Sequence, residues 1–167
     1  VHLAAHFPDV NNTTVWSDPA SGSQIEFDSF VHLAQTAERG KFDFFFLAEG
    51  LRLREQNGLI YDLDVVGRPD TFAVLSALAA VTEHLGLTGT INSTFNEPVD
   101  VARQFATLDH LSGGRFALGL GVSGPQVVEG WYGQPFAKPL ARTREYVQVV
   151  RDVLRREAPV TSAGPHY

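Results

Sequence analysis

Short β-prone runs alternate with helical segments along this chain, and this alternation limits its fold more than any other feature. Three apolar runs bounded by glycine or charge have the length of buried strands, at residues 42–48, 87–94 and 115–122. Residues 1–6 form a weaker fourth run. Because neighbouring parallel strands need a crossover connection, the alternation predicts an α/β fold with a parallel sheet. Both a doubly wound sheet and a barrel satisfy the pattern.

Apolar residues repeat at helical spacing between the predicted strands. The four apolar faces are Phe27, Phe30, Ala34 and Ala37; Leu75, Leu78, Ala79, Thr82 and Leu85; Val101, Phe105 and Leu108; and Tyr146, Val149, Val150, Val153 and Leu154. Asp70 and Asn96 have the short polar side chains that cap the starts of helices. We expect Gly40, Gly86 and Gly113 to end the first three helices.

Composition narrows the classes of partner. The chain has 167 residues, 44% of them hydrophobic, which suits one domain with a real core. The net charge is -6 and no stretch concentrates lysine and arginine, so nucleic acid is not expected as a partner. Cysteine is absent, which excludes disulfides and thiol catalysis. No signal peptide opens the chain and its apolar runs are far shorter than the roughly 20 residues of a membrane helix, so we expect a cytoplasmic protein.

Long connections follow three of the predicted strands, at residues 7–24, 49–69 and 123–138, while residues 158–167 are expected to form a turn and a short strand. Long loops on one face of an α/β fold are where binding sites are usually built. Polar groups stand at these strand ends, namely His6, Glu49, Asn92, Ser93, Thr94 and Ser123. In a barrel they would converge on one rim and hydrogen-bond the edge of a planar heteroaromatic ring, with Trp16, Trp131 or Tyr132 stacking nearby. The alternative is that each merely ends its strand or caps a loop.

Three other kinds of site have weaker support. Gly119, Gly121 and Gly124 spell G-x-G-x-x-G after a strand, as in dinucleotide-binding folds. The segment that follows is too short for the long crossover helix of that fold, and glycines where a ligand approaches a barrel strand explain the run as well. Ser123 lies in G-V-S-G-P rather than in a G-x-S-x-G elbow, which argues against a serine triad. The six histidines lack metal-binding spacing, and no metal site is expected.

Three blocks of the sequence resemble the bacterial luciferase-like superfamily. They are residues 33–49 (LAQTAERGKFDFFFLAE), 75–87 (LSALAAVTEHLGL) and 93–115 (STFNEPVDVARQFATLDHLSGGR). Within the superfamily, residues 1–115 are similar to the nitrilotriacetate monooxygenase component A branch. The resemblance implies a (β/α) TIM-type barrel that uses reduced FMN, supplied by a separate flavin reductase, to activate dioxygen and oxidise a small organic substrate.

The same resemblance implies roles for individual residues. Glu49 corresponds to the acidic residue, usually Asp, that follows the second strand in the family, and Thr90 corresponds to a flavin-contacting threonine. The implied cofactor-binding residues are Glu49, Thr90, Asn92, Ser93, Thr94, Val122 and Ser123. His6 and Glu49 are the candidate catalytic residues, with His6 facing the substrate.

From Phe116 onward the resemblance changes. Residues 116–167 look like the deazaflavin-dependent oxidoreductases of the same superfamily, which implies hydride transfer as an alternative activity. This sequence departs from that branch at Gly50, where an active-site histidine is expected.

The length of the chain adds a third hypothesis. Family barrels have eight strands, whereas this chain supplies four strand-helix units, so residues 1–167 are expected to form a single partial domain, the N-terminal half of a barrel. Its expected partners are the missing half or another copy in a homo-oligomer, because the open strand edges and apolar interior need a cover. The third hypothesis is therefore a half-barrel without catalytic activity that serves only as an interaction module.

Overall fold

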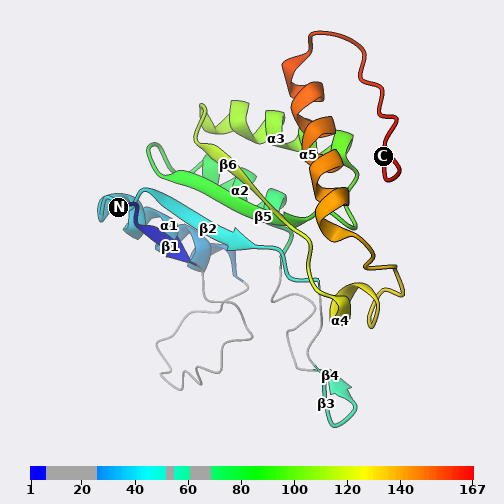
Figure 1. Ribbon diagram of the computed structural model, residues 1–167. Coiled ribbons are helices and arrows are strands. Elements are labelled where there is room, and N and C mark those ends of the chain that lie inside the picture. Colours follow the sequence, from blue (N-terminus) through cyan, green and yellow to red (C-terminus); the bar gives the residue numbers. More distant parts are fainter. Residues whose placement is uncertain (7–25, 52–54, 61–68) are drawn as a thin grey trace.

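A four-stranded parallel sheet forms the centre of the computed structural model, which describes residues 1–6, 26–51, 55–60 and 69–167 (Figure 1). The strand order is β1-β2-β5-β6, with β1 at Ala4–His6, β2 at Phe44–Ala48, β5 at Gly86–Asn92 and β6 at Phe116–Gly121. All four predicted strands are confirmed and each is shorter than predicted, although β5 begins one residue earlier. Strand order follows chain order, as it does in the successive units of a parallel barrel.

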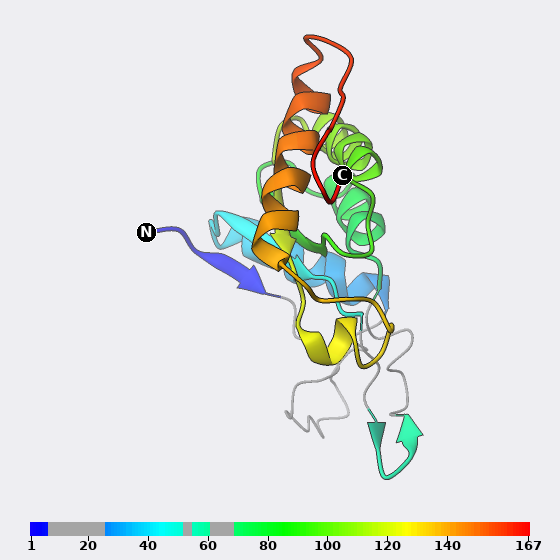
Figure 2. The same cartoon turned by 45° about the vertical axis from the view of Figure 1, so that its right-hand side comes forward.

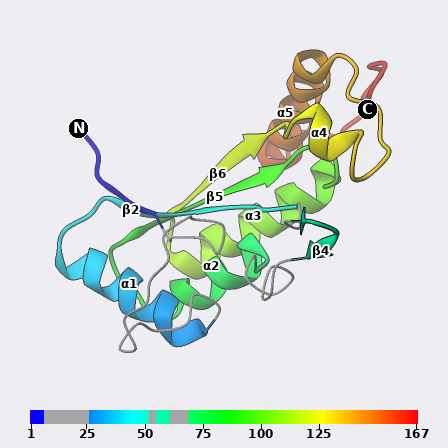
Figure 3. The same ribbon diagram turned by 90° about the horizontal axis from the view of Figure 1, so that it is seen from below.

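Five helices connect and cover the described strands. They are α1 at Phe27–Arg39, α2 at Thr71–Ala79, α3 at Pro98–Ser112, the single-turn α4 at Pro125–Val128 and α5 at Pro139–Arg155. Figure 3 shows α1, α2 and α3 on one side of the sheet. None of the helices in the described part of the chain is both long and apolar enough to cross a membrane.

The predicted long connection at residues 49–69 contains a small antiparallel hairpin that sequence analysis missed. Its strands are β3 at Glu55–Gln56 and β4 at Leu59–Ile60, joined through Asn57 and Gly58, which both take positive φ. Asn-Gly is the preferred pair for this turn because both central residues must adopt the left-handed region. Trp16 and the predicted connection at residues 7–24 lie outside the described residues.

One face of the sheet packs against the helices and the other does not. Phe45, Leu47, Leu87, Ile91 and Phe116 are all buried, and they belong to the two clusters that join the sheet to the helices. Because successive side chains of a strand point to opposite faces, the residues between them lie on the other face. That face, which α1, α2 and α3 do not cover (Figure 3), is where a ligand can reach the sheet.

Helix boundaries agree with the sequence at three capping residues, one of which is Gly40, the C-cap of α1. The Asp70 carboxylate accepts a hydrogen bond of 2.7 Å from the backbone N–H of Ala73, as expected of the residue that starts α2. Gly113 ends α3 in the left-handed region with φ of 69°.

Two expected boundaries and one expected strand are wrong. Asn96 does not cap α3, whose N-cap is Glu97, because the Asn96 amide instead bonds the preceding turn. Gly86 begins β5, since α2 stops at Ala79. Residues 158–167 contain no strand and form irregular chain that turns back along α5 (Figure 2).

The early end of α2 has a physical cause in two side chains. One oxygen of the Glu38 carboxylate accepts hydrogen bonds of 2.6–2.9 Å from the backbone N–H groups of Glu83, His84 and Leu85. Arg115 donates to the carbonyls of Ala79, Thr82, Leu85 and Ser112 and to the Thr82 hydroxyl at 2.6–3.1 Å. These bonds pair backbone groups after α2 that would otherwise pair within a longer helix. Thr82 and Leu85 are therefore buried although they lie outside the helix.

Arg115→Lys should destabilise the fold by about 2–4 kcal/mol, because a lysine ammonium cannot reproduce five bonds from one planar guanidinium. Urea unfolding followed by circular dichroism measures the change. Arg151→Lys is the matched control, since Arg151 is exposed and makes no hydrogen bond through its side chain among the described residues. Equal stability of the two variants would contradict the role of Arg115.

Candidate functional site

Residues on the uncovered face of the sheet form rows, because the strands pair in direct register. Thr90 lies opposite Ala48 on β2 and opposite Gly119 on β6. Asn92 lies opposite Gly121 in the next row toward the carboxyl end. Thr90 is therefore flanked on both sides by residues with little or no side chain, which leaves a flat area around its hydroxyl.

Gly119 keeps this area open. A Cβ atom at Gly119 would lie 2.8 Å from Oγ1 of Thr90, closer than such atoms approach in proteins. The Thr90 hydroxyl is half-buried and forms no hydrogen bond with any residue of the described ranges. A polar group that is partly removed from water without a protein partner suits contact with a ligand.

The polar turn after β5 is held by hydrogen bonds to consecutive peptide groups. Oε2 of Glu49 accepts the backbone N–H of Asn92 at 2.5 Å. The Asn96 amide donates to the Asn92 carbonyl at 2.8 Å, and the backbone N–H of Ser93 donates to the Gly121 carbonyl at 2.9 Å. The backbone N–H of Thr94 donates to Oδ1 of Asn92 at 2.6 Å. Nδ2 of Asn92 is a donor of this turn that makes no hydrogen bond to a described residue.

Glu49 connects β2 to this turn rather than projecting freely. Its Oε1 accepts a weaker bond of 3.4 Å from the Asn96 amide, and its backbone N–H donates to the Thr90 carbonyl at 2.9 Å. Burial raises the pKa of the Glu49 carboxyl above its usual value, the hydrogen bonds from Asn92 and Asn96 oppose that rise, and the charge of Asp70 adds to it. Both carboxylate oxygens thus face protein donors.

The remaining predicted site residues lie at different places on the same edge and face. His6 is exposed at the end of β1, and its ring stacks on Phe46 with centroids 5.6 Å apart. Because His6 pairs with Phe46, it lies one row below Thr90 on the uncovered face. Val122 and Ser123 follow β6, and Ser123 takes a positive φ of 59° and is exposed.

A shallow surface depression joins several of these residues to the start of α5. Its lining consists of Ser93, Thr94, Val122, Phe136, Ala137, Pro139 and Arg142. Arg142 is half-buried and makes no hydrogen bond or ion pair through its side chain within the described chain. Sequence reasoning missed Arg142, because one arginine in a helix that carries several has no distinguishing pattern.

Tyr132 links three of the connections at the carboxyl edge. Its ring packs against Phe95 with centroids 4.5 Å apart, and its hydroxyl donates to the Leu51 carbonyl at 2.5 Å. Trp131 beside it is 42% exposed. Both of these predicted stacking aromatics therefore lie in the connection between α4 and α5, and Tyr132 also contacts the turn after β5.

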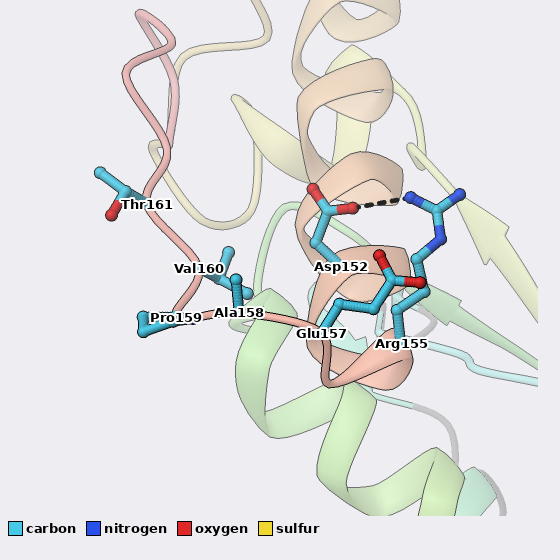
Figure 4. Close-up of a pocket in the computed structure, with 7 residues that line it drawn as sticks. All are labelled: Asp152, Arg155, Glu157, Ala158, Pro159, Val160 and Thr161. Carbon is cyan, nitrogen blue, oxygen red and sulfur yellow. Dashed lines mark hydrogen bonds and ion pairs between the residues drawn. The ribbon is translucent and has the colours of Figure 1, made fainter.

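A second depression lies at the far end of α5 and is unrelated to the strand ends. Figure 4 shows its lining, which includes Asp152, Arg155 and Glu157 together with residues 158–161. Asp152 and Arg155 form an ion pair of 3.0 Å there, so their charges largely neutralise each other. Within the described ranges, no group of three or more His, Asp or Glu residues is arranged to hold a metal ion.

Known proteins resemble this chain in both sequence and structure. A putative coenzyme F420-dependent oxidoreductase from Mycobacterium tuberculosis is 59% identical over 99 residues, which are 59% of this chain and 28% of that protein. Nitrilotriacetate monooxygenase component A from Aminobacter aminovorans is 39% identical over 107 residues, 59% of this chain and 23% of its own length. Both resemblances inferred from the sequence are confirmed.

A solved structure of riboflavin lyase with modified FMN and riboflavin superposes with a TM-score of 0.78 at 26% identity, covering 99% of this chain and 44% of that one. The chain therefore spans less than half the length of these relatives, and its four-stranded sheet corresponds to part of a larger (β/α) barrel. The sequence model of the luciferase-like monooxygenase family matches residues 10–167. Because that match covers nearly the whole chain, the protein belongs to the luciferase-like monooxygenase family.

Proposed function

We propose that this chain supplies the ring-binding part of a flavin-dependent monooxygenase. The enzyme would use reduced FMN, delivered by a separate reductase in the cytoplasm, to oxidise a small organic substrate. The observation that carries the proposal is the row of Ala48, Thr90 and Gly119, which offers one polar hydroxyl on an otherwise flat surface. Flavin, when bound, supplies the two-electron and dioxygen chemistry, and the protein supplies binding and orientation.

The donors left over at this edge match the acceptors of a flavin ring. The Thr90 hydroxyl and Nδ2 of Asn92 have no partner within the described chain, whereas Oδ1 of Asn92 is already bound to Thr94. Carbonyl oxygens on the pyrimidine part of the ring would accept from these two donors. Glu49 would act by orienting Asn92, since both of its oxygens face protein donors.

The remaining predicted residues would surround the ring. Val122 and Thr94 line the depression beside the turn together with Arg142 at the start of α5, and the Arg142 cation and the Thr94 hydroxyl would suit a negatively charged group attached to the ring. Ser123 follows Val122 directly. His6 lies one row below Thr90 and two strands away, roughly 12 Å by standard sheet spacings. At that distance His6 would face a substrate at the opposite edge of the ring.

Hydride transfer by a deazaflavin is the second candidate function. The relative from M. tuberculosis favours it, because that protein is named as F420-dependent and is 59% identical over the aligned region. Gly50 counts against a close match to that branch, since it leaves no histidine after Glu49.

Titration of the purified chain with FMN and with coenzyme F420, followed by ligand fluorescence, separates the candidate functions. Saturable binding of FMN, with weaker binding of F420, is the expected result. Preference for F420 would replace the first candidate with the second. Binding of neither cofactor would leave a half-barrel without catalytic activity that pairs with the missing half or another copy.

Thr90→Val should raise the Kd for FMN about fivefold to tenfold, because it removes one hydrogen bond while keeping the shape of the side chain. Thr88→Val is the matched control, since Thr88 lies on the same strand and face one row below. Fluorescence titration of both variants measures the difference. An unchanged Kd for Thr90→Val would contradict the ring contact.

Glu49→Gln should change how stability depends on pH. Because the folded-state pKa of Glu49 is raised, its carboxyl contributes stability that is present below the unfolded-state pKa and lost as pH rises through the folded value. The free energy of unfolding of wild type should therefore fall relative to that of the glutamine variant as pH rises from below the unfolded-state pKa through the raised folded-state pKa.

Glu38→Gln provides a control of opposite sign. Burial raises the pKa of Glu38, but the three backbone hydrogen bonds and His84 outweigh that effect and lower it overall. Its stabilising contribution is present above the unfolded-state pKa and lost as pH falls through the folded one. Urea unfolding measured from neutral pH down through the lowered folded-state pKa of Glu38 should show the two variants diverging from wild type in opposite directions, and parallel curves would contradict both assignments.

A further inference from the structure

The Ser93 carbonyl, within the polar turn after β5, is bound by a residue 74 positions away. The Tyr167 hydroxyl donates to this carbonyl at 3.2 Å. The N–H of the same peptide group belongs to Thr94 and donates to Oδ1 of Asn92 at 2.6 Å. Both ends of the Ser93–Thr94 peptide group are therefore held, one by Tyr167 and the other by Asn92.

Tyr167 is placed there by contacts of its own. Oε2 of Glu145, on α5, accepts hydrogen bonds from the backbone N–H groups of His166 at 2.9 Å and Tyr167 at 3.2 Å. A Cβ atom at Gly164 would overlap the Glu145 carboxylate, so glycine at that position allows the carboxylate to approach the backbone. Figure 2 shows this segment returning along α5 toward the sheet.

Packing adds to these hydrogen bonds. The Tyr167 ring meets Tyr146 edge-on, with centroids 5.6 Å apart and planes at 82°, and Tyr146 is fully buried between α3, α5 and the sheet. The Tyr167 hydroxyl is thus directed by a fixed backbone and a fixed ring. A side chain held in this way loses little conformational entropy when it binds the Ser93 carbonyl.

We infer that Tyr167 is a positioning residue of the ring site, acting through the Ser93–Thr94 peptide group. Without its hydrogen bond, this peptide group can rotate, and the Thr94 N–H then leaves Oδ1 of Asn92. The Asn92 amide is in turn free to rotate, so Nδ2 no longer points consistently at a ligand. This inference rests on the proposed function, in which Nδ2 of Asn92 contacts the flavin ring.

Tyr167→Phe tests the role because it removes the hydroxyl and keeps the ring. Tyr146→Phe is the matched control, since the buried Tyr146 hydroxyl has no hydrogen-bond partner in the described part of the structure. Three quantities are measured for each variant, namely the Kd for FMN, the absorption spectrum of bound FMN, and the hydrogen-exchange rate of the Thr94 amide without ligand. The exchange rate does not depend on any cofactor.

Tyr167→Phe should accelerate exchange at the Thr94 amide at least fivefold and raise the Kd for FMN about fivefold, as expected for one lost hydrogen bond. The absorption bands of bound FMN should also shift toward those of free FMN, whereas Tyr146→Phe should change none of these quantities. Unchanged exchange at Thr94 in Tyr167→Phe would overturn the inference. If wild type binds no flavin while Thr94 exchange responds as expected, the proposed function fails and the positioning of the turn stands.

Discussion

Direct register between β2, β5 and β6 is the constraint on which the site depends. A shift of one residue in β5 would turn Thr90 toward the helices and bring Ile91 to the uncovered face. Glycines on opposite faces accommodate this register. Gly89 leaves room for Leu75 of α2, where a Cβ atom would lie 2.8 Å from Cδ1 of that leucine, and Gly119 leaves room for the Thr90 hydroxyl. The packing of the helices on one face and the access of a ligand to the other face therefore depend on the same strand register.

The elements of the fold were predictable where local pattern and tertiary packing agree. Apolar runs between glycine and charge predicted the four strands, and Asp70 and Gly113 predicted real helix ends because caps depend on neighbouring backbone. The end of α2 was not predictable, since it depends on Glu38 and Arg115, which reach the segment from other parts of the chain. The helical spacing of apolar residues continues through Leu85, although α2 ends at Ala79. Thr82 and Leu85 are buried in the irregular segment as they would be on the buried face of a helix, so the sequence pattern is the same.

Prediction of the site had a similar limit. Parallel topology alone indicates that polar residues at strand ends share one edge, and the structure places Glu49, Asn92, Ser93 and Thr94 together there. Their hydrogen-bond partners could not be predicted, because the Glu49 carboxylate and the Asn96 amide are far apart in the sequence and become neighbours only when β2 pairs with β5. Tyr167 lay in a segment predicted to be a turn and strand.

Hydrogen bonding at this edge also bears on the change of resemblance near Arg115. The acceptors of the turn are occupied by protein donors, namely the Glu49 carboxylate, Oδ1 of Asn92 and the carbonyls of Asn92, Ser93 and Gly121. The Thr90 hydroxyl and Nδ2 of Asn92, which have no partner among the described residues, can each donate a hydrogen bond to the proposed ligand. Such an edge selects a ligand that presents acceptors, and FMN and a deazaflavin present the same pyrimidine carbonyls. The two cofactors would make the same demand on β5, so a chain whose first part resembles one branch and whose last part resembles the other would contain no conflict at the proposed ring contacts.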